Sequence, residues 1–242
     1  MIRAVTFDFW GTTYVEGPAA ARRRELRVQY AHGFFTGMGA QVAEQQLEYG
    51  LEIVVRQIDH ARHSRHAGLD AAETGRLLAD AVGLRLRAEE ARRLGELLSS
   101  AGREAPPVPA PGALEVLQSL HGSLRLGLIS DTGLTLGYDL YAVMEADGIA
   151  QLFDHFTFSD QTGTTKPEVR QFHHTLYRLG CEPQEAVHVG DLESTDIVGA
   201  KQAGMRAIRI LHPRQDHATT ADAAIKAMDQ LLEILRRWGA PV

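Results

Sequence analysis

AVHVGDLESTDIVGAKQAG, residues 186–204, joins a short apolar run to a helical pattern and places Asp191 and Asp196 where the two meet. A short apolar run of this kind is typical of a strand that is covered on both faces of a sheet. In open α/β sheets, ligands bind at the carboxyl ends of such strands. The stretch therefore predicts two carboxylates at the ligand-binding edge of a parallel sheet, although each aspartate alone is also compatible with an ordinary helix start.

Similar arrangements occur earlier in the chain. FDFWGT carries Asp8 at the end of the apolar run IRAVTF, and LISDTG carries Ser130 at the end of LRLGLIS. TTKPE places Lys166 directly before Pro167, which fixes a first helical turn, so the lysine lies at the anion-attracting end of a helix. Taken singly, a strand-end Asp or Ser is often a turn former or a helix cap, and an isolated Lys-Pro pair is usually exposed.

Strand-like and helical patterns alternate through residues 1–9 and roughly 108–242. This β-α-β order predicts a parallel, doubly wound sheet of the α/β class. The predicted strands are AVTFDF (4–9), LRLGLIS (124–130), HFTFS (155–159), AVHVG (186–190) and RAIRIL (206–211). The predicted helices are GALEVLQSL (112–120), LYAVMEADGI (140–149), EVRQFHHTLYRLG (168–180), STDIVGAKQAG (194–204) and ADAAIKAMDQLLEILRRW (221–238).

The segment between the first strand and the rest has a different composition. It is rich in Ala, Arg, Glu, Leu and Gln, shows helical periodicity over residues 41–58, 71–82 and 88–98, and contains no convincing strand. EAPPVPAPG, with its closely spaced prolines, then predicts a stiff linker. We therefore predict two domains, a helical domain over residues 17–104 inserted into an α/β core of residues 1–16 and 105–242.

Composition excludes several classes of function. The net charge of −6 over 242 residues argues against a nucleic-acid partner, and we expect the densest basic run, Arg22 to Arg24, to be a solvated helix face. A single cysteine, Cys181, excludes an internal disulfide and suits a reducing compartment. Neither a signal peptide nor a membrane-spanning stretch is evident. We expect a cytoplasmic monomer or homodimer without a membrane partner.

In order and spacing, the four strings resemble the motif set of the haloacid-dehalogenase-like (HAD) hydrolase superfamily. VGDLESTDIVGAKQAG is similar to the fourth motif of that family over its whole length, and the resemblance covers residues 1–13 and about 108–215. It implies a Rossmann-like core with a helical cap inserted after the first motif. The implied activity is a Mg²⁺-dependent phosphatase of a small phosphorylated metabolite.

The resemblance also implies a role for each matched residue. Asp8 is the implied nucleophile, which forms a mixed anhydride that water then opens. Lys166 would hold Asp8 ionised and neutralise charge on the transferring group. At Asp131, where Asn is frequent in the family, only the backbone N–H is carried over. The implied substrate-binding residues are Trp10, Gly11, Thr12, Ser130, Asp131 and Lys166.

A divalent cation follows from the acidic residues. Asp191 and Asp196 aimed at Asp8 would repel it strongly unless a cation neutralised them, and Mg²⁺ suits oxygen ligands. The resemblance adds the backbone carbonyl of residue 10. The predicted metal ligands are Asp8, Trp10 through its carbonyl, Asp191 and Asp196.

Trp10 departs from the family pattern, because most of its phosphatases carry a second aspartate there that protonates the leaving group. Indole cannot do this, and loss of a general acid typically costs ~10²–10⁴ in rate. Three hypotheses follow: a phosphatase whose leaving group needs little protonation or whose acid comes from the cap, a 2-haloacid dehalogenase, and a non-catalytic phospho-ligand binder. The acidic pair disfavours the second, because metal-free dehalogenases usually lack it.

Other candidate residues have simpler explanations. His60, His63 and His66 share a spacing of three residues, but without a carboxylate partner we expect a solvated face rather than a metal site. His173 and His174 are expected to pack or to face water. Cys181 has no thiol-activating context.

Overall fold

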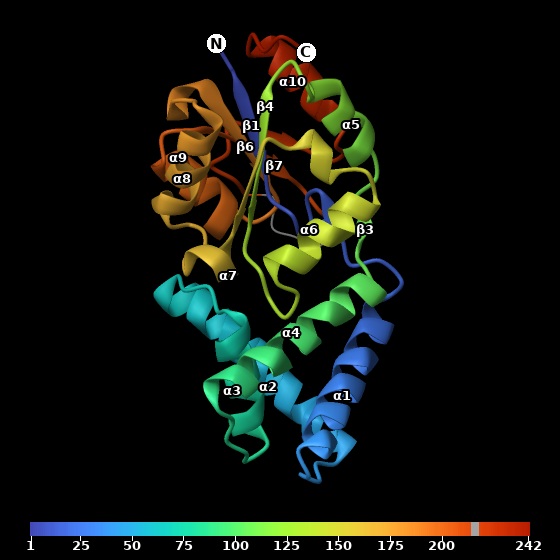
Figure 1. Ribbon diagram of the computed structural model, residues 1–242. Coiled ribbons are helices and arrows are strands. Elements are labelled where there is room, and N and C mark those ends of the chain that lie inside the picture. Colours follow the sequence, from blue (N-terminus) through green and yellow to red (C-terminus); the bar gives the residue numbers. More distant parts are fainter. Residues whose placement is uncertain (214–217) are drawn as a thin grey trace.

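A parallel sheet forms the centre of the protein (Figure 1). The computed structural model describes residues 1–213 and 218–242, so residues 214–217 of the predicted core segment 105–242 lie outside it. The described residues form six strands in the order β5-β4-β1-β6-β7-β8, and all neighbouring strands are parallel. The strands are β1 (Ala4–Phe7), β4 (Arg125–Ser130), β5 (His155–Phe158), β6 (Ala186–Gly190), β7 (Arg206–Ile210) and β8 (Ala223–Ile225).

Strand β1 lies at the centre of the sheet, between β4 and β6. Phe7 at its end is paired with Leu128 on one side and with Val189 on the other. From β1 the chain first adds β4 and β5 on one side, and it then returns to add β6, β7 and β8 on the other. A reversal of strand order opens a crevice at the carboxyl ends of the strands, and Asp8 directly follows β1 at this point.

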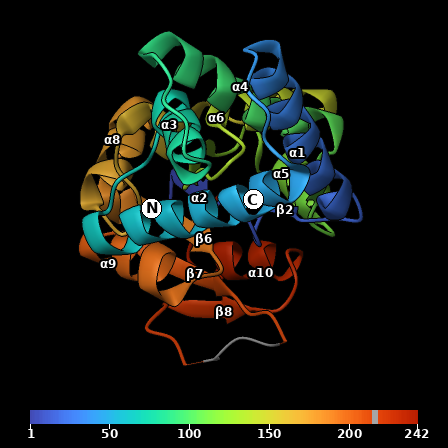
Figure 2. The same ribbon diagram turned by 90° about the horizontal axis from the view of Figure 1, so that it is seen from below.

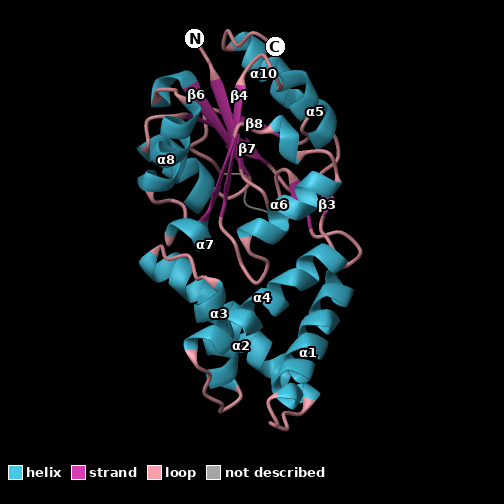
Figure 3. Ribbon diagram, in the orientation of Figure 1, coloured by secondary structure: helices cyan, strands magenta, loops and turns pink. Residues whose placement is uncertain are grey.

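Helices cover both faces of the sheet (Figures 1 and 3). One face packs against α5 (Ala113–Leu120), α6 (Gly137–Ala146) and α10 (Gln230–Arg237), and the other against α8 (Val169–Leu179) and α9 (Val198–Gln202). This arrangement confirms the predicted doubly wound α/β fold. Shorter elements are α7 (Ser159–Thr162), 3-10 turns at Ala150–Leu152 and Pro183–Glu185, and a π-helical turn at Glu193–Ile197.

The helices between β2 (Tyr14–Val15) and β3 (Val108–Pro109) lie over the carboxyl ends of the strands, and we call them the cap. Seen from below (Figure 2), α2 crosses in front of the core, while β8 lies beyond the edge of the cap. The cap helices form a hydrophobic cluster that includes several fully buried leucines and is joined by Leu134, which follows β4. Its helices are α1 (Ala20–Gly37), α2 (Glu44–Arg65), α3 (Ala71–Ala81) and α4 (Ala88–Glu104).

Helices α3 and α4 approach each other very closely. A Cβ atom added at Gly95 of α4 would lie only 1.9 Å from the backbone oxygen of Ala71 at the start of α3. No side chain fits at that distance, so glycine is required here and lets the two backbones touch. The close packing makes α3 and α4 one rigid pair inside the cap.

Two expectations from the sequence are wrong in detail. The predicted helix over residues 221–238 is instead β8 followed by α10, which begins only at Gln230. The outer edge of β7 offers unpaired N–H and C=O groups, and pairing with them outweighs the weak helix preference of the alanines. The predicted linker EAPPVPAPG contains β3, which pairs antiparallel with β2, so the chain segments that enter and leave the cap run side by side.

Among the described residues, no helix combines the length and the apolar character that crossing a membrane requires.

Candidate active site

The matched residues meet at the carboxyl edge of the sheet. Asp8 directly follows β1, Ser130 ends β4, and Asp191 directly follows β6. Lys166 comes from the segment before α8. All four residues are buried. Strands far apart in the sequence thus bring a carboxylate, a hydroxyl, an ammonium and a second carboxylate to one place, as their strand-end positions predict.

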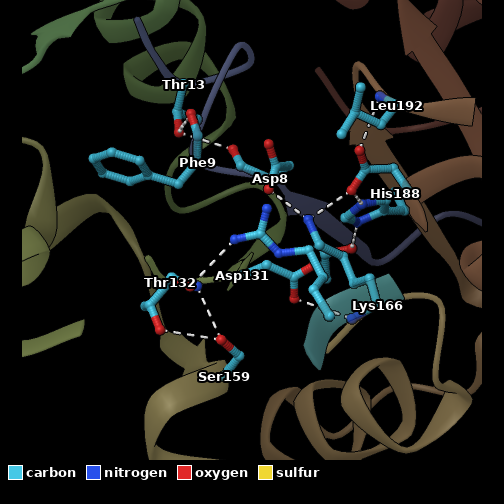
Figure 4. A network of polar contacts seen from close by, with 12 residues as sticks. Asp8, Phe9, Thr13, Asp131, Thr132, Ser159, Lys166, His188 and Leu192 are labelled. Carbon is cyan, nitrogen blue, oxygen red and sulfur yellow. Dashed lines mark hydrogen bonds and ion pairs between the residues drawn. The ribbon is translucent and has the colours of Figure 1, made fainter. Parts of the chain in front are cut away.

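Lys166 joins two of the aspartates (Figure 4). Its Nζ lies 2.5 Å from Oδ1 of Asp8 and 2.6 Å from Oδ1 of Asp196, and the residue is only 2% exposed. Burial by itself lowers the pKa of Lys166, but Asp196 and Asp8 raise it by more, so the net direction is upward. The side chain is therefore an ammonium at all ordinary pH values and places a positive charge against Asp8.

Asp196 is held by a chain of hydrogen bonds. Its Oδ2 accepts from the N–H of Leu192 at 3.0 Å, and its Oδ1 lies 3.3 Å from Nε2 of His188. The other ring nitrogen of His188 contacts Oγ1 of Thr6 at 2.8 Å. Burial raises the pKa of Asp196, but Lys166 and His188 lower it by more, so the carboxylate stays ionised. The contacts with Leu192 and His188 fix the orientation of the Asp196 carboxylate.

His188 was not singled out in the sequence. A signal was present, because a histidine in the middle of the strand AVHVG has to be buried and therefore needs polar partners.

The acidic residues form a compact cluster. Asp8, Asp191 and Asp196 each offer an oxygen, and these oxygens lie within 4.8 Å of one another. Burial raises the pKa of Asp8, the neighbouring Asp196 and Asp191 carboxylates add to this, and Lys166 only partly opposes it. The single Lys166 ammonium therefore does not balance the three carboxylates, and their oxygen donors fit a hard divalent cation such as Mg²⁺.

Gly11 permits the close approach of the first loop to Asp191. Its φ is +73°, and an added Cβ would lie 2.7 Å from Oδ2 of Asp191. The backbone oxygen of Asp191 accepts a hydrogen bond from Nε of the buried Arg209 at 3.0 Å. The backbone on both sides of the acidic cluster is thus fixed. Arg209 was not singled out in the sequence either, where it is one of the two arginines of RAIRIL and the one that lies between apolar residues.

Two buried hydroxyls at the site lack partners. Oγ of Ser130 and Oγ1 of Thr12 make no hydrogen bond with any described residue. A buried hydroxyl that is left unpaired is costly, so these groups suit a ligand with acceptor oxygens, such as a phosphoryl group. The side chain of Asp131 has a different contact: its Oδ1 accepts from the backbone N–H of Lys166 at 3.0 Å and so positions the lysine segment.

A cavity of about 290 Å³ separates this edge from the cap. Trp10 lines it beside Asp8, and the indole ring lies 5.9 Å from the guanidinium of Arg23. Core residues in the lining include Asp8, Trp10, Asp131, Lys166 and Asp196; the cap side contributes Arg23, Arg27, Arg62 and His63 among others. Gly11, Thr12, Ser130 and Asp191 are not among the described residues that line it.

The cap arginines are a correction to the sequence analysis. We expected Arg22 to Arg24 to be a solvated face, but Arg23 is only 3% exposed and donates to the backbone oxygen of Ala105 at 2.7 Å and to Glu16. Its neighbours Arg22 and Arg24 are exposed. Successive residues of a helix point in different directions, and about every third or fourth residue faces the same side. Three consecutive arginines therefore cannot all face the solvent. The sequence contained no signal to show which arginine turns inward.

The remaining candidates lie as simple packing predicts. His60 and His63 are exposed, His66 is partly buried, and within the described residues the acidic triad is the one cluster whose spacing suits a metal. His173 and His174 are exposed, and Cys181 is buried, which raises the pKa of its thiol.

Comparisons with known proteins agree with this geometry. A family model described as haloacid dehalogenase-like hydrolase matches residues 2–204. A glyceraldehyde 3-phosphate phosphatase from Methanopyrus kandleri is 29% identical to this chain, and the match covers 98% of both chains. A solved 2-haloacid dehalogenase from Pseudomonas syringae has a TM-score of 0.68 at 27% identity, covering 98% of this chain and 100% of that one. A solved HAD phosphatase from Thermococcus onnurineus has a TM-score of 0.67 at 26% identity. The match covers 97% of this chain and 98% of that one.

Proposed function

We propose that this chain, which belongs to the haloacid dehalogenase-like hydrolases, is a Mg²⁺-dependent phosphatase of small phosphorylated metabolites that reacts through an aspartyl-phosphate on Asp8. The observation that carries the proposal is the contact of Lys166 with Asp8 and Asp196 beside a third carboxylate, Asp191. A nucleophile, a fixed cation and a divalent-metal donor set lie together, which is more than ligand binding requires.

In this mechanism, a carboxylate oxygen of Asp8 forms a bond to phosphorus while the bond to the leaving oxygen breaks. The Lys166 ammonium stabilises the charge on the transferring group, and the Ser130 and Thr12 hydroxyls donate hydrogen bonds to its oxygens. Water then opens the mixed anhydride and restores Asp8. Mg²⁺, held by Asp8, Asp191, Asp196 and the backbone carbonyl of Trp10, would supply further neutralising charge at the phosphoryl group.

The substrate class rests on similarity and size. The Methanopyrus relative is named for a three-carbon phosphate ester, and the cavity of about 290 Å³ suits a ligand of that size. Trp10 offers no proton to the leaving oxygen, so the leaving group must be weakly basic or receive its proton from another donor.

The test is a phosphate-release assay on glyceraldehyde 3-phosphate, acetyl phosphate and p-nitrophenyl phosphate, with Mg²⁺ and with EDTA. We expect turnover that EDTA removes and Mg²⁺ restores, that Asp8→Asn abolishes, and that Asp191→Asn lowers together with Mg²⁺ affinity in calorimetry. The conservative Asp→Asn changes are checked for folding by thermal unfolding. Phosphate release that survives Asp8→Asn or EDTA would refute the assignment.

A 2-haloacid dehalogenase is the second candidate. Halide leaves without a proton, so Trp10 is no obstacle, and the Pseudomonas structure carries that description. Metal-independent chloride release from 2-chloropropionate, lost in Asp8→Asn, would establish this activity in place of the phosphatase.

A further inference from the structure

Arg27 of α1 is a buried cation without a carboxylate partner. It is 8% exposed and lines the same cavity as Asp8. Its Nε donates to the backbone oxygen of Leu98 at 3.1 Å and its Nη2 to Oγ1 of Thr135 at 2.7 Å, and both acceptors are neutral. In the described part of the chain, Arg27 forms no ion pair, and its Nη1 makes no hydrogen bond.

The other arginines of the cavity differ in this respect. Arg23 is paired with Glu16, and Nη1 of Arg62 lies 3.5 Å from Oδ1 of Asp59. Their charges are therefore compensated within the cap. Arg27 has no carboxylate in contact: Glu16 acts on it only from a longer range, and the neighbouring positive charges of Arg23 and Arg24 oppose that effect.

A buried guanidinium that has only neutral acceptors is costly, because its desolvation is not repaid by an opposite charge. Burial and the neighbouring Arg23 lower the pKa of Arg27 to about 10, so the group still carries its proton at neutral pH. An uncompensated cation that lines a cavity is a ready partner for an anion. The planar fork of arginine suits a carboxylate in particular.

Building on the proposed phosphatase, we propose that Arg27 binds a second anionic group of the substrate, so that the favoured substrates are phosphate esters of small hydroxy acids. The phosphoryl group lies at Asp8, Ser130 and Lys166, and the carboxylate lies at the cap side of the cavity. The cavity volume of about 290 Å³ is at the lower limit of ligand sites, so the carbon chain between the two groups is short.

Two substrates of the same carbon skeleton test this. Glyceraldehyde 3-phosphate ends in an aldehyde, and 3-phosphoglycerate ends in a carboxylate. We expect a higher kcat/KM for 3-phosphoglycerate, lowered about 10- to 100-fold in Arg27→Gln mainly through KM, as for loss of a charge-assisted hydrogen bond. Turnover of glyceraldehyde 3-phosphate should change less than about threefold. Arg24→Gln, an exposed neighbour outside this cavity, is the matched control and should change neither.

A binding measurement removes the dependence on turnover. Calorimetric titration of 3-phosphoglycerate into the Asp8→Asn protein should give an affinity at least about 10-fold higher than titration into Asp8→Asn/Arg27→Gln. If Arg27→Gln does not fold, as judged by thermal unfolding, Arg27→Lys decides, because it keeps the charge but loses the fork. Arg27→Lys should lower the ratio of kcat/KM for 3-phosphoglycerate to kcat/KM for glyceraldehyde 3-phosphate.

The outcomes separate this inference from the proposed function. If no phosphate ester is hydrolysed with Mg²⁺, the phosphatase assignment fails. If glyceraldehyde 3-phosphate is hydrolysed, but Arg27→Gln lowers turnover of both substrates equally or leaves the calorimetric affinity unchanged, Arg27 is a structural clamp between α1, α4 and Thr135. The inference is then wrong and the phosphatase stands.

Discussion

At the scale of single residues, Trp10 is the position at which this chain departs from the motif pattern of its family. Its ring packs edge-on against Phe9 and lies under the guanidinium of Arg23, so the indole forms part of the cavity wall two residues after Asp8. Arg23 in turn is held by Glu16 and the backbone of Ala105. Trp10 therefore connects the loop after β1 to the cap, and in the proposed phosphatase its indole has no proton to supply to the leaving group.

From this we predict a steep dependence of rate on the leaving group. An aryl or acyl phosphate leaves as a weak base, whereas an alkyl phosphate needs a proton, so turnover should differ by about the 10²–10⁴ that a general acid contributes. Steady-state kcat/KM on p-nitrophenyl phosphate and on glyceraldehyde 3-phosphate measures this. Trp10→Asp should narrow the gap, and Asp8→Asn should abolish both reactions. Equal rates in the native protein would reveal another proton donor.

At the scale of elements, the sequence predicted every described strand of the six-stranded sheet except β8. The strands that end near Asp8, Ser130 and Asp191 are apolar, short and punctuated by polar residues, so pattern alone located them. Strand β8 escaped prediction because ADAAI has no strand pattern of its own and pairs only because the edge of β7 is available. Local sequence does not encode such an available edge.

The cap illustrates the same limit. Helical periodicity predicted helices over residues 41–58, 71–82 and 88–98, which correspond to α2, α3 and α4. The face that each helix buries depends on the helices packed against it. The inward orientation of Arg23 and Arg27 could therefore not be predicted from the sequence. The division into domains at residues 16 and 104 remains a prediction, as do the catalytic roles of the site residues.

Replacing two glycines of the cap by alanine should change the free energy of unfolding in opposite directions. Gly95→Ala forces a Cβ to within 1.9 Å of the Ala71 oxygen, so α3 and α4 must separate, and we expect a loss of about 1–3 kcal/mol in the free energy of unfolding. Gly33 lies on an exposed position of α1 with nothing within 4 Å of an added Cβ. Gly33→Ala should therefore stabilise by about 1 kcal/mol.

Urea unfolding followed by circular dichroism measures both changes. A Gly95→Ala protein as stable as the native one would mean that α3 and α4 are not in backbone contact.

At the scale of the whole molecule, cap and core meet around one segment. Nη2 of Arg62 donates to the backbone oxygen of Thr132 at 3.3 Å, Arg27 reaches Thr135, and Ser99 of α4 donates to the buried Asp139 of α6. All three contacts involve residues that follow β4. The segment that follows Ser130 thus contacts the cap and directly continues the strand end at the candidate active site.

Metal binding should stabilise the whole protein measurably. Mg²⁺ neutralises three buried carboxylates in the folded state and finds no such cluster in the unfolded chain, so at about 100 times its Kd it should add about 2.7 kcal/mol. For a chain of this size, that raises Tm by roughly 5–10 °C. Differential scanning fluorimetry with and without Mg²⁺ is the measurement.

Asp191→Asn should lose most of this increase, and Asp229→Asn, far along the chain at the start of α10, serves as the control. An increase in Tm that is equally large in Asp191→Asn would show that the ion binds elsewhere.

The central place of β1 has a consequence for biosynthesis. Strand β1 precedes both of its neighbours in the sheet, β4 and β6, by more than a hundred residues in the sequence, so both neighbours are synthesised much later. At a synthesis rate of about 5–20 residues per second, Asp196 is added to the chain roughly 10–40 s after Asp8. A chain that ends before Asp196 lacks one carboxylate of the acidic cluster and a contact partner of Lys166. If Asp8 and Asp196 act as proposed, we expect chains truncated before Asp196 to be inactive in the phosphate-release assay.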